Sequence, residues 1–70
     1  MKAIKSDMAG TVLEVKVKVG DAVAVGLEVV VMESMKMEVP VLSQVTGKVS
    51  AILKKAGDFA NDGDTLIELS

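Results

Sequence analysis

The sequence of 70 residues contains no cysteine, histidine, tryptophan or tyrosine, and all eight of its basic residues are lysine. Without cysteine and histidine there are no disulfides, no thiol or imidazole metal ligands and no imidazole general base. The lack of arginine removes the planar group that binds carboxylates and phosphates in a bidentate manner. We therefore expect no metal site and no catalytic residues in this chain, so that any reactive group must be supplied from outside.

Aromatic residues and strong net charge are scarce as well. Phe59 is the only aromatic residue, and the formal net charge at pH 7 is −2. A surface that binds nucleic acid needs basic side chains and aromatic faces for stacking, so we expect no nucleic-acid partner. The first ten residues contain no apolar stretch, and the longest uncharged segment, Val39 to Gly47, is too short to span a bilayer. These features predict no signal peptide, no membrane association and a cytoplasmic location.

What the chain does contain is typical of β-structure. Apolar and charged residues alternate from Leu13 to Val19, which predicts a strand with its valines on one face. Thirteen valines favour strands over helices because branching at Cβ restricts χ1. Pro40 cannot donate a backbone hydrogen bond and is expected at an edge, a bulge or a strand start. Phe59 is predicted to belong to the core. Further strands are predicted at Val29–Met32, Met37–Leu42, Gly47–Leu53 and Thr65–Leu69, with turns at Gly20-Asp21, Gly57-Asp58 and Asn61–Asp64.

An internal repeat organises these strands. A shift of 37 residues aligns residues 8–33 with residues 45–70 without a gap, and it pairs all six glycines with one another. Since glycines mark special backbone positions, the two halves are expected to follow one backbone path. We predict a single all-β domain over residues 1–70, a flattened β-barrel or sandwich of two quasi-symmetric halves. The linker Ser34–Gln44 has no equivalent in this alignment, which predicts Lys36 on a hairpin tip opposite both chain termini.

The segment Glu33-Ser34-Met35-Lys36-Met37-Glu38 is the one part of the chain whose pattern suggests chemistry. Its simplest interpretation is a hairpin with a solvated lysine, because lysine is normally exposed. The position of Lys36 at the junction of the two repeat units, between two flexible methionines that can adapt to a partner, favours a functional role.

The run ESMKMEVP, residues 33–40, resembles the attachment site of biotinyl domains, in which a lysine between two methionines receives biotin. Met8-Ala9-Gly10 with Gly20-Asp21 in the first half, and Gly47 with Gly57-Asp58 in the second, are similar to the same family. The resemblance covers nearly the whole chain and extends to the short free-standing biotin/lipoyl attachment proteins. It implies covalent attachment at Lys36, recognition through the flanking Met35 and Met37, and candidate ligase contacts at Glu33, Ser34 and Glu38.

The same resemblance implies a carrier rather than an enzyme. An ordinary lysine amine has a pKa of about 10.4, so it is protonated at neutral pH and is a weak nucleophile. The resemblance therefore implies a biotin protein ligase that supplies biotinyl-adenylate. The later partners would be biotin carboxylase and carboxyltransferase subunits, with the chain itself a monomer. Two departures from the family are Ser34 in place of a common alanine, and the lack of the inserted thumb between Val12 and Glu28 that some acetyl-CoA carboxylase carriers have.

Two alternatives remain open at this point. Lipoyl domains share the fold, but their lysine typically follows an aspartate, whereas Met35 precedes Lys36 here; the short attachment proteins are thought to accept either cofactor, so lipoate stays a second candidate beside biotin. The other alternative is a scaffold barrel in which Lys36 is not modified. The acidic residues of the C-terminal turns lack the spacing of a calcium loop and are assigned to turn formation: Asp58, Asn61, Asp62 and Asp64.

Overall fold

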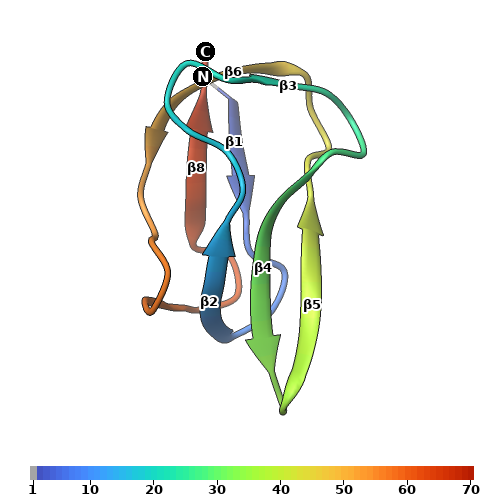
Figure 1. Cartoon of the computed structure of the whole chain (residues 1–70), viewed down its shortest axis with the longest axis vertical. Helices are drawn as coiled ribbons and strands as arrows, with labels where there is room; N and C mark the ends of the chain where they lie inside the picture. Colours follow the sequence, from blue (N-terminus) through green and yellow to red (C-terminus); the bar gives the residue numbers. More distant parts are fainter. Residues whose placement is uncertain (1) are drawn as a thin grey trace.

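The computed structural model describes residues 2–70, in which all regular structure is β-strand (Figure 1). The strands form two four-stranded sheets in which every neighbouring pair is antiparallel. One sheet has the order β1 (Lys2–Lys5), β8 (Thr65–Leu69), β6 (Gly47–Ile52) and β3 (Ala22–Val23). The other has the order β5 (Met37–Leu42), β4 (Glu28–Ser34), β2 (Gly10–Val15) and β7 (Phe59–Ala60). The predicted all-β class is confirmed.

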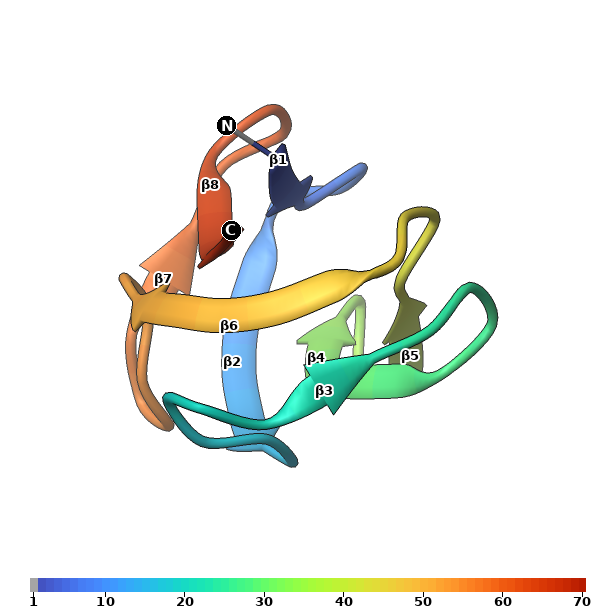
Figure 2. The ribbon, with the colours of Figure 1, turned by 90° about the horizontal axis from the view of Figure 1, so that it is seen from above.

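The core lies between the two sheets and is built from aliphatic side chains of both. Burying such side chains stabilises the fold by roughly 1.5–3 kcal/mol each, which matters in a domain that has neither disulfides nor aromatic bulk inside. Viewed from above, β6 stretches across the end of the molecule from the side of β7 and β8 to the side of β3 and β5 (Figure 2). The fully buried large side chains are Met32, Leu66, Ile67, Leu69, Val12, Val29 and Val30.

Hydrogen bonds from a backbone N–H to an aspartate carboxylate recur at an offset of 37 residues. The Lys18 N–H donates to the Asp21 carboxylate over 2.9 Å, and the Lys55 N–H donates to the Asp58 carboxylate over 2.8 Å. Each aspartate thereby closes its own loop, and each is followed by a two-residue strand, β3 or β7. The two quasi-symmetric halves predicted from the paired glycines are therefore present in the fold.

The same offset extends further than the sequence alignment did. Lys2 pairs with Leu69 in the β1–β8 ladder, and the residues 37 positions away, Val39 and Met32, pair in the β5–β4 ladder. The assignment of Ser34–Gln44 as a linker without equivalents was therefore wrong in its second part, because residues 39–42 of β5 correspond to residues 2–5 of β1. The sequence hides this match because the paired positions are not identical residues.

Two other sequence-based predictions fail for local reasons. The predicted strand Leu13–Val19 ends at Val15, and the register of β2 against β4 shifts around Leu13, which leaves this residue 38% exposed. Such a bulge breaks the alternation that the sequence pattern assumed. Phe59 is 55% exposed rather than in the core. In a strand successive side chains point to opposite faces, and in β7 the buried position is taken by Ala60.

The chain termini and the β4–β5 turn lie at opposite ends of the molecule (Figure 1). At the terminal end the Ser70 N–H donates to the Lys48 carbonyl over 2.8 Å, which fastens the C-terminus to β6. Pro40 lies in β5, an edge strand of its sheet, as its missing N–H requires. The predicted placement of Lys36 on a hairpin tip opposite the termini is confirmed.

Candidate functional site

A two-residue turn connects β4 and β5. Ser34 and Met37 form the last pair of the ladder, so that only Met35 and Lys36 make the turn. Both have positive φ, 54° and 64°, which is the requirement of a type I′ turn. That conformation costs a residue with a Cβ roughly 1–2 kcal/mol relative to the right-handed regions. The other positive-φ residues in the described part of the chain are all glycines, so this turn concentrates the backbone strain at Met35 and Lys36.

Contacts with β2 hold the base of this strained turn in place. The Ser34 hydroxyl donates to the Ala9 carbonyl over 3.1 Å, just before β2 begins. Gly10 lies so close to β4 that a Cβ atom on it would overlap the carbonyl oxygen of Glu33. The buried side chain of Met32 anchors the same strand from the core side. The hairpin therefore projects beyond the barrel from a fixed base, and its tip is the part that remains accessible.

The predicted site residues are brought together on this tip, on two faces of the hairpin. Met35 is 92% exposed and Met37 is 66% exposed, and Lys36 between them is exposed as well. Glu33 and Glu38 are exposed and directly opposite each other in the register, and paired residues share a face of the sheet. Like charges in this arrangement destabilise a ladder, so the pair does not serve the stability of the hairpin.

Ser34 differs from the other predicted site residues because it is half-buried. Its hydroxyl is engaged with Ala9 rather than directed freely into solvent. The partner residue Ala9 was not predicted as part of the site, although its neighbour Gly10 belongs to a repeat-paired glycine set and could have indicated close strand approach. The Ser34 side chain therefore connects the base of the turn to the segment just before β2.

The outer face of the sheet below the turn carries mixed charges. A shallow groove of about 500 Å³ on this face is lined by residues of β2, β4 and β5 and by Lys16. Lys16 donates to Glu28 over 2.9 Å, and the hydrogen bond to Glu28 and its charge raise the pKa of the Lys16 amine. The ion pairs of residues 2–70 are Lys16–Glu28 and Lys54–Asp64, and neither involves Lys36. Its amine is therefore not engaged by a carboxylate of the described chain.

Neither a metal centre nor a membrane-spanning helix is found in the described residues. In residues 2–70, no three side chains of the metal-ligating acidic, histidine or cysteine types come together in a cluster. None of the chain described here forms a helix with the length and apolarity that crossing a bilayer requires.

Fold and site together define a class of protein: small all-β domains of two similar halves that present a lysine on a tight hairpin, far from the chain termini. A family model described as "Biotin-requiring enzyme", that of the biotin/lipoyl family, matches residues 2–69. The chain belongs to this biotin/lipoyl family.

Relatives of two kinds are similar to this chain. It is 48% identical over 67 residues to the Biotin/lipoyl attachment protein of Bacillus subtilis, covering 96% of this chain and 92% of that protein. It is also 46% identical to a segment of the human mitochondrial Propionyl-CoA carboxylase alpha chain, covering 94% of this chain but 9% of that protein. Among solved structures, Kluyveromyces lactis urea carboxylase matches with a TM-score of 0.89 and 33% identity, covering 99% of this chain and 6% of that one. The chain thus spans nearly the whole length of the Bacillus subtilis relative but only a small part of the two carboxylases.

Proposed function

We propose that this chain is a biotin-accepting carrier domain that is biotinylated on Lys36 by a biotin protein ligase. The observation that supports this most directly is the turn itself, in which an exposed lysine without an ion pair projects from a fixed hairpin base. The match of residues 2–69 to the family model described as "Biotin-requiring enzyme" supports biotin as the group attached.

The fit between this site and biotin follows from what covalent attachment needs. The Lys36 amine attacks the acyl carbon of an adenylated biotin, an amide bond forms, the acyl–phosphate bond breaks, and AMP and a proton leave. A ligase has to approach the amine from several sides, and the tight turn presents it with little chain left to be ordered on binding. Met35 and Met37 would give the ligase apolar contacts on both sides of the amine, while Glu33 and Glu38 would add charge recognition.

After attachment the chain would act as a tethered carrier within one domain over residues 1–70, in the cytoplasm. Biotin supplies the carboxyl-carrying chemistry, and biotin carboxylase and carboxyltransferase subunits supply the catalysis. The amide removes the lysine charge, so that the arm enters partner sites as a neutral group. Its tether would hold biotin near those sites at roughly millimolar effective concentration.

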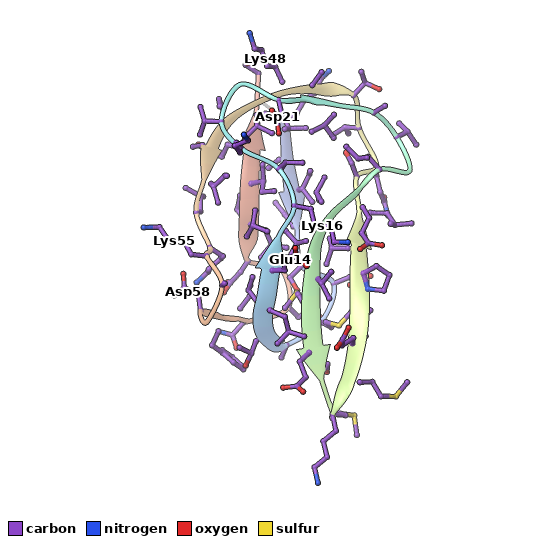
Figure 3. The ribbon with its side chains drawn as sticks, viewed as in Figure 1. Glu14, Lys16, Asp21, Lys48, Lys55 and Asp58 are labelled. Carbon is purple, nitrogen blue, oxygen red and sulfur yellow. The ribbon has the colours of Figure 1, made fainter. Side chains whose placement is uncertain are left out.

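The test is the intact mass of the chain after incubation with a biotin protein ligase, biotin and MgATP. We expect one biotinyl group per chain, none on Lys36→Ala, and one on the matched control Lys48→Ala. Lys48 is an exposed lysine at the opposite end of the molecule, so its loss leaves the turn unchanged (Figure 3). Full labelling of Lys36→Ala would refute Lys36 as the attachment site. A lipoyl group added by a lipoate ligase in a parallel incubation would favour the lipoyl carrier. A chain that neither ligase modifies would favour the scaffold barrel.

A further inference from the structure

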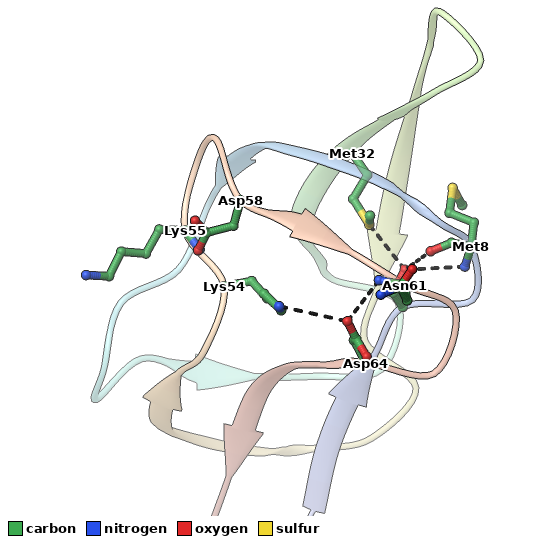
Figure 4. Close-up of polar contacts among 8 residues, drawn as sticks. Met8, Met32, Lys54, Lys55, Asp58, Asn61 and Asp64 are labelled. Atoms are coloured by element: carbon green, nitrogen blue, oxygen red, sulfur yellow. Dashed lines mark hydrogen bonds and ion pairs between the residues drawn. The ribbon is translucent and has the colours of Figure 1, made fainter.

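The methionines of residues 2–70 differ widely in their access to solvent. Met35 and Met37, on either side of Lys36, are 92% and 66% exposed, whereas Met32 is fully buried. The sulfur of Met32, which Figure 4 labels, lies 3.4 Å from the buried Ser6 hydroxyl oxygen. Met8 is half-buried and packs against the core cluster. Within residues 2–70, the two thioethers most open to reagents in solution therefore both lie beside the candidate attachment lysine.

The composition leaves oxidants few other targets. The sequence contains no cysteine, tryptophan, tyrosine or histidine, so methionine is the most easily oxidised side chain present. Oxygen transfer to sulfur requires direct contact between the oxidant and the thioether. An oxidant can contact the exposed side chains of Met35 and Met37 directly, whereas the side chain of Met32 is buried.

We propose that Met35 and Met37 form a reversible oxidation site that controls recognition of the Lys36 turn. A hydroperoxide transfers one oxygen atom to the thioether: the S–O bond forms as the O–O bond breaks, sulfur loses two electrons, and the peroxide is reduced to water or an alcohol. A methionine sulfoxide reductase with a dithiol reverses the step, giving thioether, water and disulfide. The oxidation site follows from exposure alone, while its effect on biotin acceptance rests on the proposed function.

The structure separates the effect on recognition from any effect on folding. The exposed side chains of Met35 and Met37 would carry their new oxygen atoms into solvent, so the core packing stays as it is. At Met32 an added oxygen would enter a fully packed core and destabilise the fold. A polar sulfoxide in a partner site that receives an apolar methionine slows the acceptance of biotin by about ten-fold or more.

The first experiment maps oxidation by peptide mass spectrometry during a hydrogen peroxide time course. Trypsin cleaves after Lys36, so Met37 falls in peptide 37–48, while Met32 and Met35 share peptide 19–36 and are resolved by fragmentation. We expect Met35 and Met37 to oxidise more than about ten-fold faster than Met32, with an unchanged melting temperature. Oxidation of Met32 at the rate of its exposed neighbours would overturn the assignment.

The second experiment compares biotin acceptance before and after mild peroxide treatment within each variant. Treated wild type and the matched control Met8→Leu should accept biotin about ten-fold more slowly, and sulfoxide reductase should restore the rate. Met35→Leu/Met37→Leu, which has no thioether at the tip, should keep its own untreated rate. An unchanged rate for the wild type with both sulfoxides formed, or equal sensitivity of the double variant, would refute the regulatory role. Failure of the untreated wild type to accept biotin would instead refute the proposed function, and the peptide map would still decide the oxidation site.

Discussion

Gly10 allows the close approach of β2 to β4 that fixes the base of the Lys36 hairpin. A Cβ atom at this position would overlap the Glu33 carbonyl oxygen and lie 3.2 Å from the carbonyl carbon. Both are backbone atoms of the strand that leads into the turn, so the overlap is relieved only by moving that strand. Overpacking of this kind costs about 1–3 kcal/mol, while replacing glycine returns about 0.5–1 kcal/mol of chain entropy. We therefore expect Gly10→Ala to lower the free energy of unfolding by about 1–2 kcal/mol.

The repeat supplies a matched control for this substitution. Gly47 lies 37 positions after Gly10, and a Cβ atom there would lie 3.0 Å from the Ser70 carbonyl oxygen and 3.2 Å from the Leu69 Cβ. The Ser70 carbonyl accepts a hydrogen bond from the Lys48 N–H, but both distances are tight contacts rather than overlaps, so a shift of a few tenths of an ångström relieves them. The tight contact and the gain in chain entropy should nearly cancel, so we expect Gly47→Ala to change the stability by less than about 0.5 kcal/mol.

Differential scanning calorimetry is the suitable assay because the chain has no tryptophan or tyrosine to report unfolding by fluorescence. For a domain of this size, the expected loss in Gly10→Ala corresponds to a melting temperature about 4–16 °C below the wild type. Gly47→Ala should melt within a few degrees of it. Equal melting temperatures for the two variants would show that the approach of β2 to β4 does not require glycine, and would refute the reasoning.

Two further predictions concern the turn and the outer face of the sheet. Asparagine tolerates positive φ better than methionine, so Met35→Asn should raise the free energy of unfolding by about 1 kcal/mol and the melting temperature by about 4–8 °C; an unchanged value would mean that the turn is not strained. Glu28 raises the pKa of the Lys16 amine, so the stabilisation from this pair is complete below the ordinary lysine pKa of about 10.4 and is lost as the pH rises through the raised value. The urea midpoint of Glu28→Gln should thus lie below that of the wild type at pH 7 and approach it once the pH exceeds the raised pKa of Lys16, and a constant difference would contradict this sign.

Much of the fold could be predicted from glycine spacing and valine content, because these features report backbone conformation and strand preference directly. The offset of 37 residues located both halves, and the unmatched junction located the Lys36 turn. Strand ends were less predictable. The bulge at Leu13 depends on how β2 meets β4, which no alternation within one strand can show. The exposure of Phe59 likewise depends on which residue of β7 faces inward, and a two-residue strand has no periodicity to reveal it.

Two serines are buried, although serine is usually expected at the surface. Ser6 and Ser43 are 2% and 1% exposed, and each hydroxyl donates to a carbonyl two residues ahead, that of Met8 or Val45. The two serines are 37 residues apart and each lies two positions before an aligned half, so the same offset pairs them. They were missed because an isolated serine in a polar segment is usually assigned to solvent. A residue type that recurs at the repeat offset indicates a structural role even when its chemistry suggests the surface.

The backbone strain at Met35 and Lys36 is tolerated because neither side chain is needed to fill the core. Residues 39–42 of β5 repeat the pairing of residues 2–5 of β1, whereas Met35 and Lys36 lie beyond the last pair of the β4–β5 ladder. Core packing therefore places no demand on this segment, and its side chains are exposed. The contacts that could carry strain into the barrel end at Ser34 and Gly10, where β4 is fixed to the start of β2. A two-residue left-handed turn can thus hold the lysine outward at a cost of about 2–4 kcal/mol that remains confined to the tip.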